Sequence, residues 1–102
     1  WGYEIIWAET ASYVGKILHI NAGHRLSKQY HNVKEETLYV LGGTLCNYAE
    51  SGEIQRFHPG EVFHVEPGQI HRFGALENNV EVVEVSTPHL DDVVRLEDDY
   101  TR

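Results

Sequence analysis

Two histidines, a glutamate and a glutamine occur in the sequence at spacings that would let their side chains meet. Gln29 and His31 are two residues apart, and in a β-strand such side chains share one face, about 6.6 Å apart along the strand. Glu36 follows a short polar turn, after which a returning strand would point it to the same interior. His71 comes later, after a Pro67-Gly68 turn between two strand-like runs. We therefore expect the four side chains to surround one cavity.

Imidazole, carboxylate and amide groups gathered in this way are ligands for a divalent metal ion. Two imidazoles with one carboxylate suit Zn, Fe, Ni or Mn, and an amide oxygen does not choose among them. The sequence predicts one such ion per chain, with zinc as the first expectation and nickel, manganese or iron as alternatives. The competing interpretation is that the histidines are hydrogen-bonded core residues and the other two are ordinary polar residues of strands. The predicted ligands are Gln29, His31, Glu36 and His71.

Two further residues are candidates for catalysis. Arg25 has the same strand parity as Gln29, so its guanidinium could enter the cavity and hold an anionic substrate, or could lie at the rim. His64 is a candidate acid–base residue, but the pattern of its strand does not fix the direction of its ring. Lys34 and Arg72 could reach a phosphate at the cavity mouth or could be surface charges.

Short strand-like runs alternate with turn residues along the chain and predict an all-β fold of two facing sheets. No long helical pattern interrupts them. The last segment, 90–102, is acidic with a small apolar anchor and is expected to form a short helix or an extended arm. The predicted strands cover residues 3–8, 13–20, 25–31, 36–41, 44–48, 53–57, 61–65, 71–74 and 80–86.

Length, charge and cysteine content narrow the function classes. The 102 residues suit one domain, 1–102. A formal net charge of -8 disfavours binding to nucleic acid or to an anionic membrane surface. Cys46 is the single cysteine and is expected to be a small core residue. The single cysteine, together with the lack of a signal-like or membrane-spanning run, predicts a cytoplasmic protein.

The residues around the predicted ligands resemble the motifs of the cupin superfamily. Its first motif has a glycine, a His-x-His pair, a glutamate and a closing glycine, and here it runs from Gly23 to Gly43 with Gln29 in place of the first histidine. The stretch GHRLSKQYH at 23–31 is similar to the form of this motif in type II mannose-6-phosphate isomerases. The second motif is matched by Pro67, Gly68, His71 and Arg72.

Both ends of the chain resemble the same isomerase branch, at 1–4 and at 91–100. Departures from it lie at Leu38, where the branch has an aromatic residue, at 32–33, where its turn is rich in histidine, and at Glu66, where the second motif usually has its proline. These departures bear on the substrate more than on the fold.

The resemblance implies a cupin double-stranded β-helix, or jelly-roll barrel, that binds a metal through the four predicted ligands. It further implies an aldose–ketose isomerase acting on a sugar phosphate such as mannose 6-phosphate, and a homodimer formed through outer sheet faces. The fold alone leaves open a metal-binding cupin of another activity, namely a dioxygenase, a lyase or a small-molecule binding module.

Overall fold

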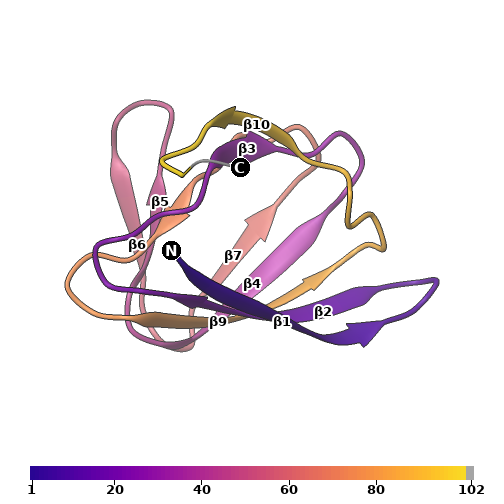
Figure 1. The fold of residues 1–102 in the computed structure, drawn as a ribbon, viewed down its shortest axis with the longest axis horizontal. Helices are drawn as coiled ribbons and strands as arrows, with labels where there is room; N and C mark the ends of the chain where they lie inside the picture. Colours follow the sequence, from indigo (N-terminus) through magenta and orange to yellow (C-terminus); the bar gives the residue numbers. More distant parts are fainter. Residues whose placement is uncertain (101–102) are drawn as a thin grey trace.

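The computed structural model describes residues 1–100 and consists of β-strands and loops (Figure 1). All nine predicted strands are present, so the all-β prediction is confirmed. Among residues 1–100 we find no helix that is long and apolar enough to cross a membrane. The strands are β1 (Gly2–Glu9), β2 (Val14–Ile20), β3 (Lys28–Tyr30), β4 (Glu36–Gly42), β5 (Leu45–Tyr48), β6 (Ile54–Phe57), β7 (Val62–Val65), β8 (Phe73–Gly74), β9 (Val80–Ser86) and β10 (Val94–Glu97).

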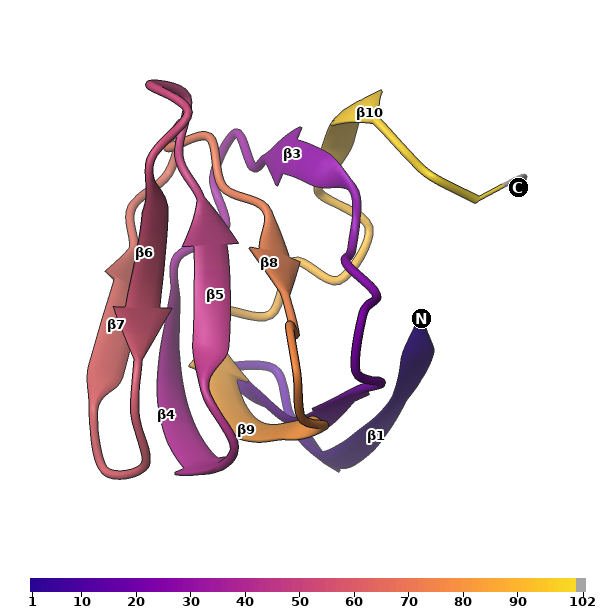
Figure 2. The same cartoon turned by 90° about the vertical axis from the view of Figure 1, so that its left-hand side faces the viewer.

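The strands form two facing layers. One layer is a five-stranded antiparallel sheet in the order β1-β2-β9-β4-β7. The other contains the sheet β6-β5-β8 and the pair β10-β3, which lie side by side in Figure 2. Antiparallel bridges from Arg25 to Gly74 and from Gln29 to His71 join these two parts into one layer. Strands from distant parts of the chain are thereby brought to face each other across one interior.

The interior is apolar at one end and polar at the other. Along β2, β4 and β9, alternate residues point inward and are buried, as strand geometry requires. In these strands the inward positions include Lys16, Glu36 and Glu84 beside aliphatic residues. A polar cavity therefore adjoins the core. The core consists of Leu18, Ile20, Leu38, Val40, Leu45, Phe63, Val65, Phe73, Ala75, Val80 and Val82.

Two glycine turns fix how the strands that carry the predicted ligands meet. Gly43 has a φ of 72°, and a Cβ there would collide with the carbonyl oxygen of Asn79, so the turn from β4 to β5 requires glycine. Gly68 has a φ of 81°, and its N–H donates to the carbonyl of His31 at 2.6 Å. The turn before His71 is thus tied directly to the strand end that carries His31.

The C-terminal segment is an extended arm that crosses the second layer. Its strand β10 pairs with β3. The arm is anchored by Arg72, whose buried guanidinium contacts Glu97 at 3.1 Å and Asp99 at 2.8 Å. Of the two expectations for this segment, the extended arm is the one observed, and residues 101–102 lie outside the described part of the chain.

Candidate metal centre

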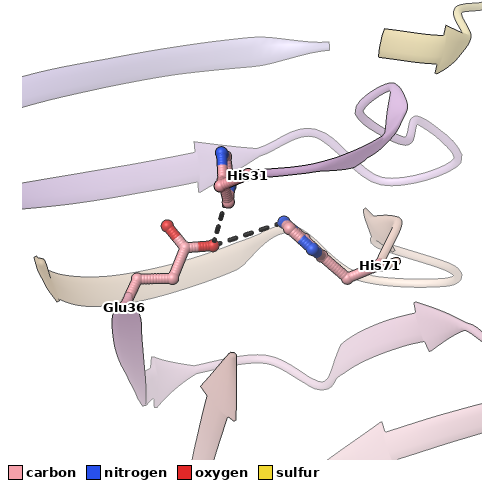
Figure 3. A group of neighbouring side chains, drawn as sticks. All are labelled: His31, Glu36 and His71. Atoms are coloured by element: carbon pink, nitrogen blue, oxygen red, sulfur yellow. Dashed lines mark ion pairs between the residues drawn. The ribbon is translucent and has the colours of Figure 1, made fainter. Parts of the chain in front are cut away.

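His31, Glu36 and His71 converge on one point in the polar cavity (Figure 3). Their three candidate ligand atoms all lie within 4.8 Å of one another, and all three residues are buried. Glu36 Oε1 lies 3.6 Å from His31 Nε2 and 3.3 Å from His71 Nε2. The structure therefore brings together three of the four residues that the sequence predicts as ligands.

Hydrogen bonds orient both imidazoles with Nε2 toward Glu36. His31 Nδ1 lies 2.6 Å from the backbone carbonyl of Asp92, and His71 Nδ1 lies 3.0 Å from that of Gln69. A carbonyl oxygen only accepts, so Nδ1 carries the proton in each ring and the Nε2 of a neutral ring presents a lone pair. Within residues 1–100, His31 Nε2 is the buried side-chain N or O atom that lacks a hydrogen-bond partner. Two lone pairs and a carboxylate facing one point favour a cation there.

The distances also fit a metal ion. Zn–N and Zn–O bonds are about 2.1 Å long, so neighbouring ligands of a tetrahedral ion lie roughly 3.4 Å apart. The contacts of Glu36 Oε1 with the two histidines, 3.3 and 3.6 Å, bracket that value. The donor set and its spacing therefore fit one divalent ion.

Lys34 leaves only one oxygen of Glu36 free for such an ion. Its Nζ lies 2.9 Å from Glu36 Oε2, the oxygen turned away from the histidines. Burial alone would raise the pKa of Glu36, but in the metal-free site hydrogen bonds from His31 and His71, with the Lys34 ammonium, outweigh burial and lower the pKa below its usual value. Glu36 is therefore held as a carboxylate with Oε1 directed at the two rings.

Gln29 completes the group at its edge. Its amide nitrogen lies 3.4 Å from His71 Nε2, and its amide oxygen accepts a hydrogen bond from Ser27 Oγ at 2.9 Å. Half a turn of the terminal amide exchanges the two atoms and directs the oxygen at the metal position, while Ser27 Oγ can then accept from the amide nitrogen. Gln29 is thus within reach of the group, and as a ligand it stays a prediction.

Gln29, His31 and Glu36 line a cavity of about 190 Å³, and a buried charge pair also lies in its wall. Lys34 Nζ lies 3.4 Å from Glu84 Oε2, and both residues are buried. Burial raises the pKa of Glu84 to about 7, the nearby carboxylate of Glu36 adds to this shift, and the lysines oppose it. Lys16, on β2, is the strand partner of Glu84 on β9, and its ammonium pairs with Glu4 at 3.3 Å. The cavity therefore carries acid–base groups outside the ligand triad.

The two residues predicted to act in catalysis lie outside this cavity. His64 is on the outer face of β7, where its Nε2 contacts Glu35 at 2.8 Å and Glu66 at 3.2 Å. Arg25 lies at the rim, paired with Asp99 at 2.6 Å and packed over the Tyr48 ring. The acid–base groups that face the ligand triad are Lys34 and Glu84 instead.

Lys34 and Arg72 are both buried, not surface charges at the mouth. Lys34 turns inward to two carboxylates, and Arg72 holds the C-terminal arm.

Glu84 and Lys16 are cavity residues that the sequence motifs did not predict. A signal for them exists, because each occupies the inward phase of a strand whose other inward residues are mainly aliphatic.

Comparison with known families decides the assignment of the fold. Residues 16–86 match the model of the cupin domain family. The chain is a cupin. The predicted superfamily is therefore confirmed, and the group His31, Glu36 and His71 is the cupin's candidate metal site.

Three comparisons illustrate the range of proteins that this cupin resembles. Quercetin 2,3-dioxygenase of Bacillus subtilis (strain 168) is 31% identical over 68 residues, which are 67% of this chain and 20% of that protein. The cupin thus spans about a fifth of that relative's length. A Klebsiella pneumoniae protein with a double-stranded β-helix domain superposes with a TM-score of 0.82 at 20% identity, covering 94% of this chain and 80% of the other.

The third is a proposed sugar phosphate isomerase from Acidithiobacillus ferrooxidans, with a TM-score of 0.66 at 16% identity, covering 74% of this chain and 50% of the other. At such identities the structural likeness establishes the fold, which confirms the predicted double-stranded β-helix. Cupins with different reactions share that fold, so the chemistry must be argued from the site.

Proposed function

We propose that this cupin is a metal-dependent aldose–ketose isomerase that acts on a sugar phosphate such as mannose 6-phosphate. One divalent ion, zinc in the first instance, would be held in the cavity by four side chains. The proposed ligands are Gln29, His31, Glu36 and His71.

One observation supports an enzyme most directly: an acid–base pair faces the same cavity as the candidate metal ligands. Lys34 and Glu84 are buried, lie 3.4 Å apart, and line the same cavity as His31 and Glu36. Charged groups are costly to bury unless they are paired or used. A module that only stores a metal has no need of a carboxylate outside the ligand group. The resemblance of the Gln29-x-His31 motif to the isomerase branch supports the choice of reaction.

Aldose–ketose isomerisation moves one proton from C2 to C1 of the open-chain sugar and another between the oxygens on these carbons. A bound divalent ion supplies Lewis-acid polarisation of substrate oxygens. In our proposal Glu84 takes the proton from C2 and returns it to C1 as a general base and then acid. Lys34 holds one Glu84 oxygen at 3.4 Å and so fixes the carboxylate relative to the cavity.

The test is turnover of mannose 6-phosphate and fructose 6-phosphate by the metal-loaded protein, with Glu84→Gln compared with Glu81→Gln. Glu81 lies on the same strand but pairs with His19 at 2.7 Å. We expect interconversion without oxygen, a loss of about 10²- to 10⁴-fold in kcat for Glu84→Gln, and unchanged activity for Glu81→Gln. Metal content is measured for each sample. Absence of turnover, or full activity in Glu84→Gln at equal metal content, would contradict the proposal.

A dioxygenase is the second candidate, because the relative that is 31% identical is named quercetin 2,3-dioxygenase. Oxygen chemistry at a cupin site requires Fe(II) or another redox-active metal with open coordination positions. Oxygen consumption by the Fe(II)-loaded protein in the presence of a flavonol such as quercetin would favour this reaction. Isomerase activity under nitrogen with zinc would favour the first.

A homodimer is part of the proposed function, and the outer face of the five-stranded sheet is the surface we assign to it. On β1, Tyr3, Ile5 and Trp7 are 49–54% exposed. Tyr39 on β4 and Val62 on β7 are also exposed. Apolar surface that extends over several strands is typical of a contact between protein molecules, and a second copy of this chain is the partner we propose.

A further inference from the structure

Arg95 is a cationic residue that lines the candidate metal cavity and has no acidic partner in the part of the chain that the structure describes. It is exposed on β10, and its side chain contributes to the cavity wall. The other two cations of the wall are engaged: Lys16 with Glu4, and Lys34 with Glu36 and Glu84. Within residues 1–100, no carboxylate lies within ion-pair distance of Arg95.

Strand pairing directs Arg95 over the ligand group. Arg95 is the antiparallel partner of Gln29 in the β3–β10 pair. Directly paired residues of antiparallel strands point to the same face, with Cβ atoms about 4.5–5.5 Å apart. The side chain of Gln29 faces His71 inside the cavity. Val93, which directly precedes β10, also lines the cavity.

Among residues 1–100 the charge of Arg95 is therefore uncompensated, at the cavity mouth of a chain whose formal net charge is -8. The planar guanidinium matches carboxylate and phosphate groups because it can donate two parallel hydrogen bonds to them. Elsewhere on the surface an acidic chain repels such anions. An anion is thus favoured at this mouth over the acidic parts of the described surface.

We propose that Arg95 binds the oxyanion of the substrate, a phosphate or a carboxylate, and so positions the rest of the molecule against the metal group. This inference rests on the proposed function, since it assigns a role at the same cavity. Arg95 would act as a specificity residue: it selects substrates with a negative group at one end and takes no part in proton transfer.

Three sugars that differ only at C6 test the proposal: mannose 6-phosphate, mannuronate and mannose, titrated by calorimetry into the metal-loaded protein. We expect the protein to bind at least one charged sugar about 10- to 100-fold more tightly than mannose, as befits a charge-assisted hydrogen-bonded pair. The charged sugar that binds more tightly tells phosphate from carboxylate. Arg95→Gln should lose this preference, and Arg95→Lys should retain part of it.

Arg56→Gln is the matched control, because Arg56 is also an exposed arginine but lies on β6 beside a different hollow. It should keep the full preference. An unchanged preference in Arg95→Gln, an equal loss in Arg56→Gln, or no preference in the unaltered protein would each overturn the proposal. The metal content of the same samples separates failure of the proposed function from failure of the proposed role of Arg95. A protein that binds no metal contradicts the proposed function, and the same titrations on it still decide the role of Arg95.

Discussion

The backbone carbonyl of Asp92 accepts a hydrogen bond from His31 Nδ1 at 2.6 Å. The side chain of the same residue accepts from the backbone N–H groups of Asn32, Val33 and Lys34 at 2.7–3.0 Å. One residue of the C-terminal arm thus orients a candidate metal ligand and caps the turn that leads to Glu36. The arm is part of the metal site although it lies some 60 residues from His31 in sequence.

Asp92→Ala is therefore expected to weaken metal binding. Without the cap, the turn and the carbonyl that orients His31 are free to move. Groups that orient a metal ligand typically contribute 10- to 100-fold to metal affinity, and we predict a loss of about this size. The dissociation constant for zinc, from competition with a chromophoric chelator, is the measurement. Asp91→Ala is the control, because Asp91 is exposed and has no side-chain hydrogen bond among those described. Equal affinities of the two variants would contradict this role.

The same cap predicts a pH dependence of stability in the metal-free protein. Three backbone N–H groups lower the pKa of Asp92 from 3.8 to about 2. A lowered pKa stabilises the fold above the unfolded-state value, and this contribution disappears as the pH falls through the folded-state value. The unfolding free energies of the unaltered protein and of Asp92→Asn, measured in urea with a chelator, should therefore differ at pH 5 and converge between pH 4 and 2. A difference that is constant with pH would be inconsistent with the cap.

Lys34→Met should destabilise the protein strongly. It leaves the buried carboxylates of Glu36 and Glu84 facing each other without the ammonium between them. Breaking a buried ion pair on one side typically costs about 3–5 kcal/mol. Lys28→Met, which removes the more exposed pair of Lys28 with Glu50, should cost about 1 kcal/mol or less. The free energy of unfolding of both variants is measured in urea. Similar losses of unfolding free energy would mean that Lys34 is not the counter-charge of the cavity.

The proposed dimer predicts that a charge on the outer face separates the subunits. Ile5→Glu places a carboxylate in the apolar surface of β1, where Ile5 is 49% exposed. Sedimentation velocity should show a dimer for the unaltered protein and a monomer for Ile5→Glu. Val33→Glu, at a residue that is 59% exposed in the turn before β4, should remain dimeric. A monomeric unaltered protein would rule out this interface.

Sequence alternation was sufficient for the strands and for the convergence of His31, Glu36 and His71, because turn residues and inward periodicity act locally. Alternation did not give the direction of His64, because β7 carries apolar residues on both faces. Phe63 is buried, whereas Val62 is 52% exposed on the outer sheet face. Parity could not therefore give the direction of the ring.

For Arg25 the sequence left two positions open, inside the cavity and at its rim, and the structure shows the second. The regular strand β3 covers only Lys28–Tyr30, so strand parity does not extend back to Arg25, which forms an isolated bridge with Gly74. The inward turn of Lys34 depends on Glu84, which is distant in sequence and becomes its neighbour only when β4 pairs with β9. Contacts of this kind follow from the tertiary fold and leave no local pattern.

Metal stoichiometry tests the central claim most directly. The protein, purified without added metal and then after incubation with Zn, Ni, Mn or Fe(II), is analysed for bound metal beside a His31→Ala/His71→Ala double variant. A His19→Ala/His89→Ala variant, with the same number of histidines removed outside the cavity, is the control. We predict one ion per chain in the unaltered protein and the control, and none in the His31→Ala/His71→Ala variant. No bound metal under any of these conditions, or equal metal in all three proteins, would contradict the assignment of this cavity as a metal site.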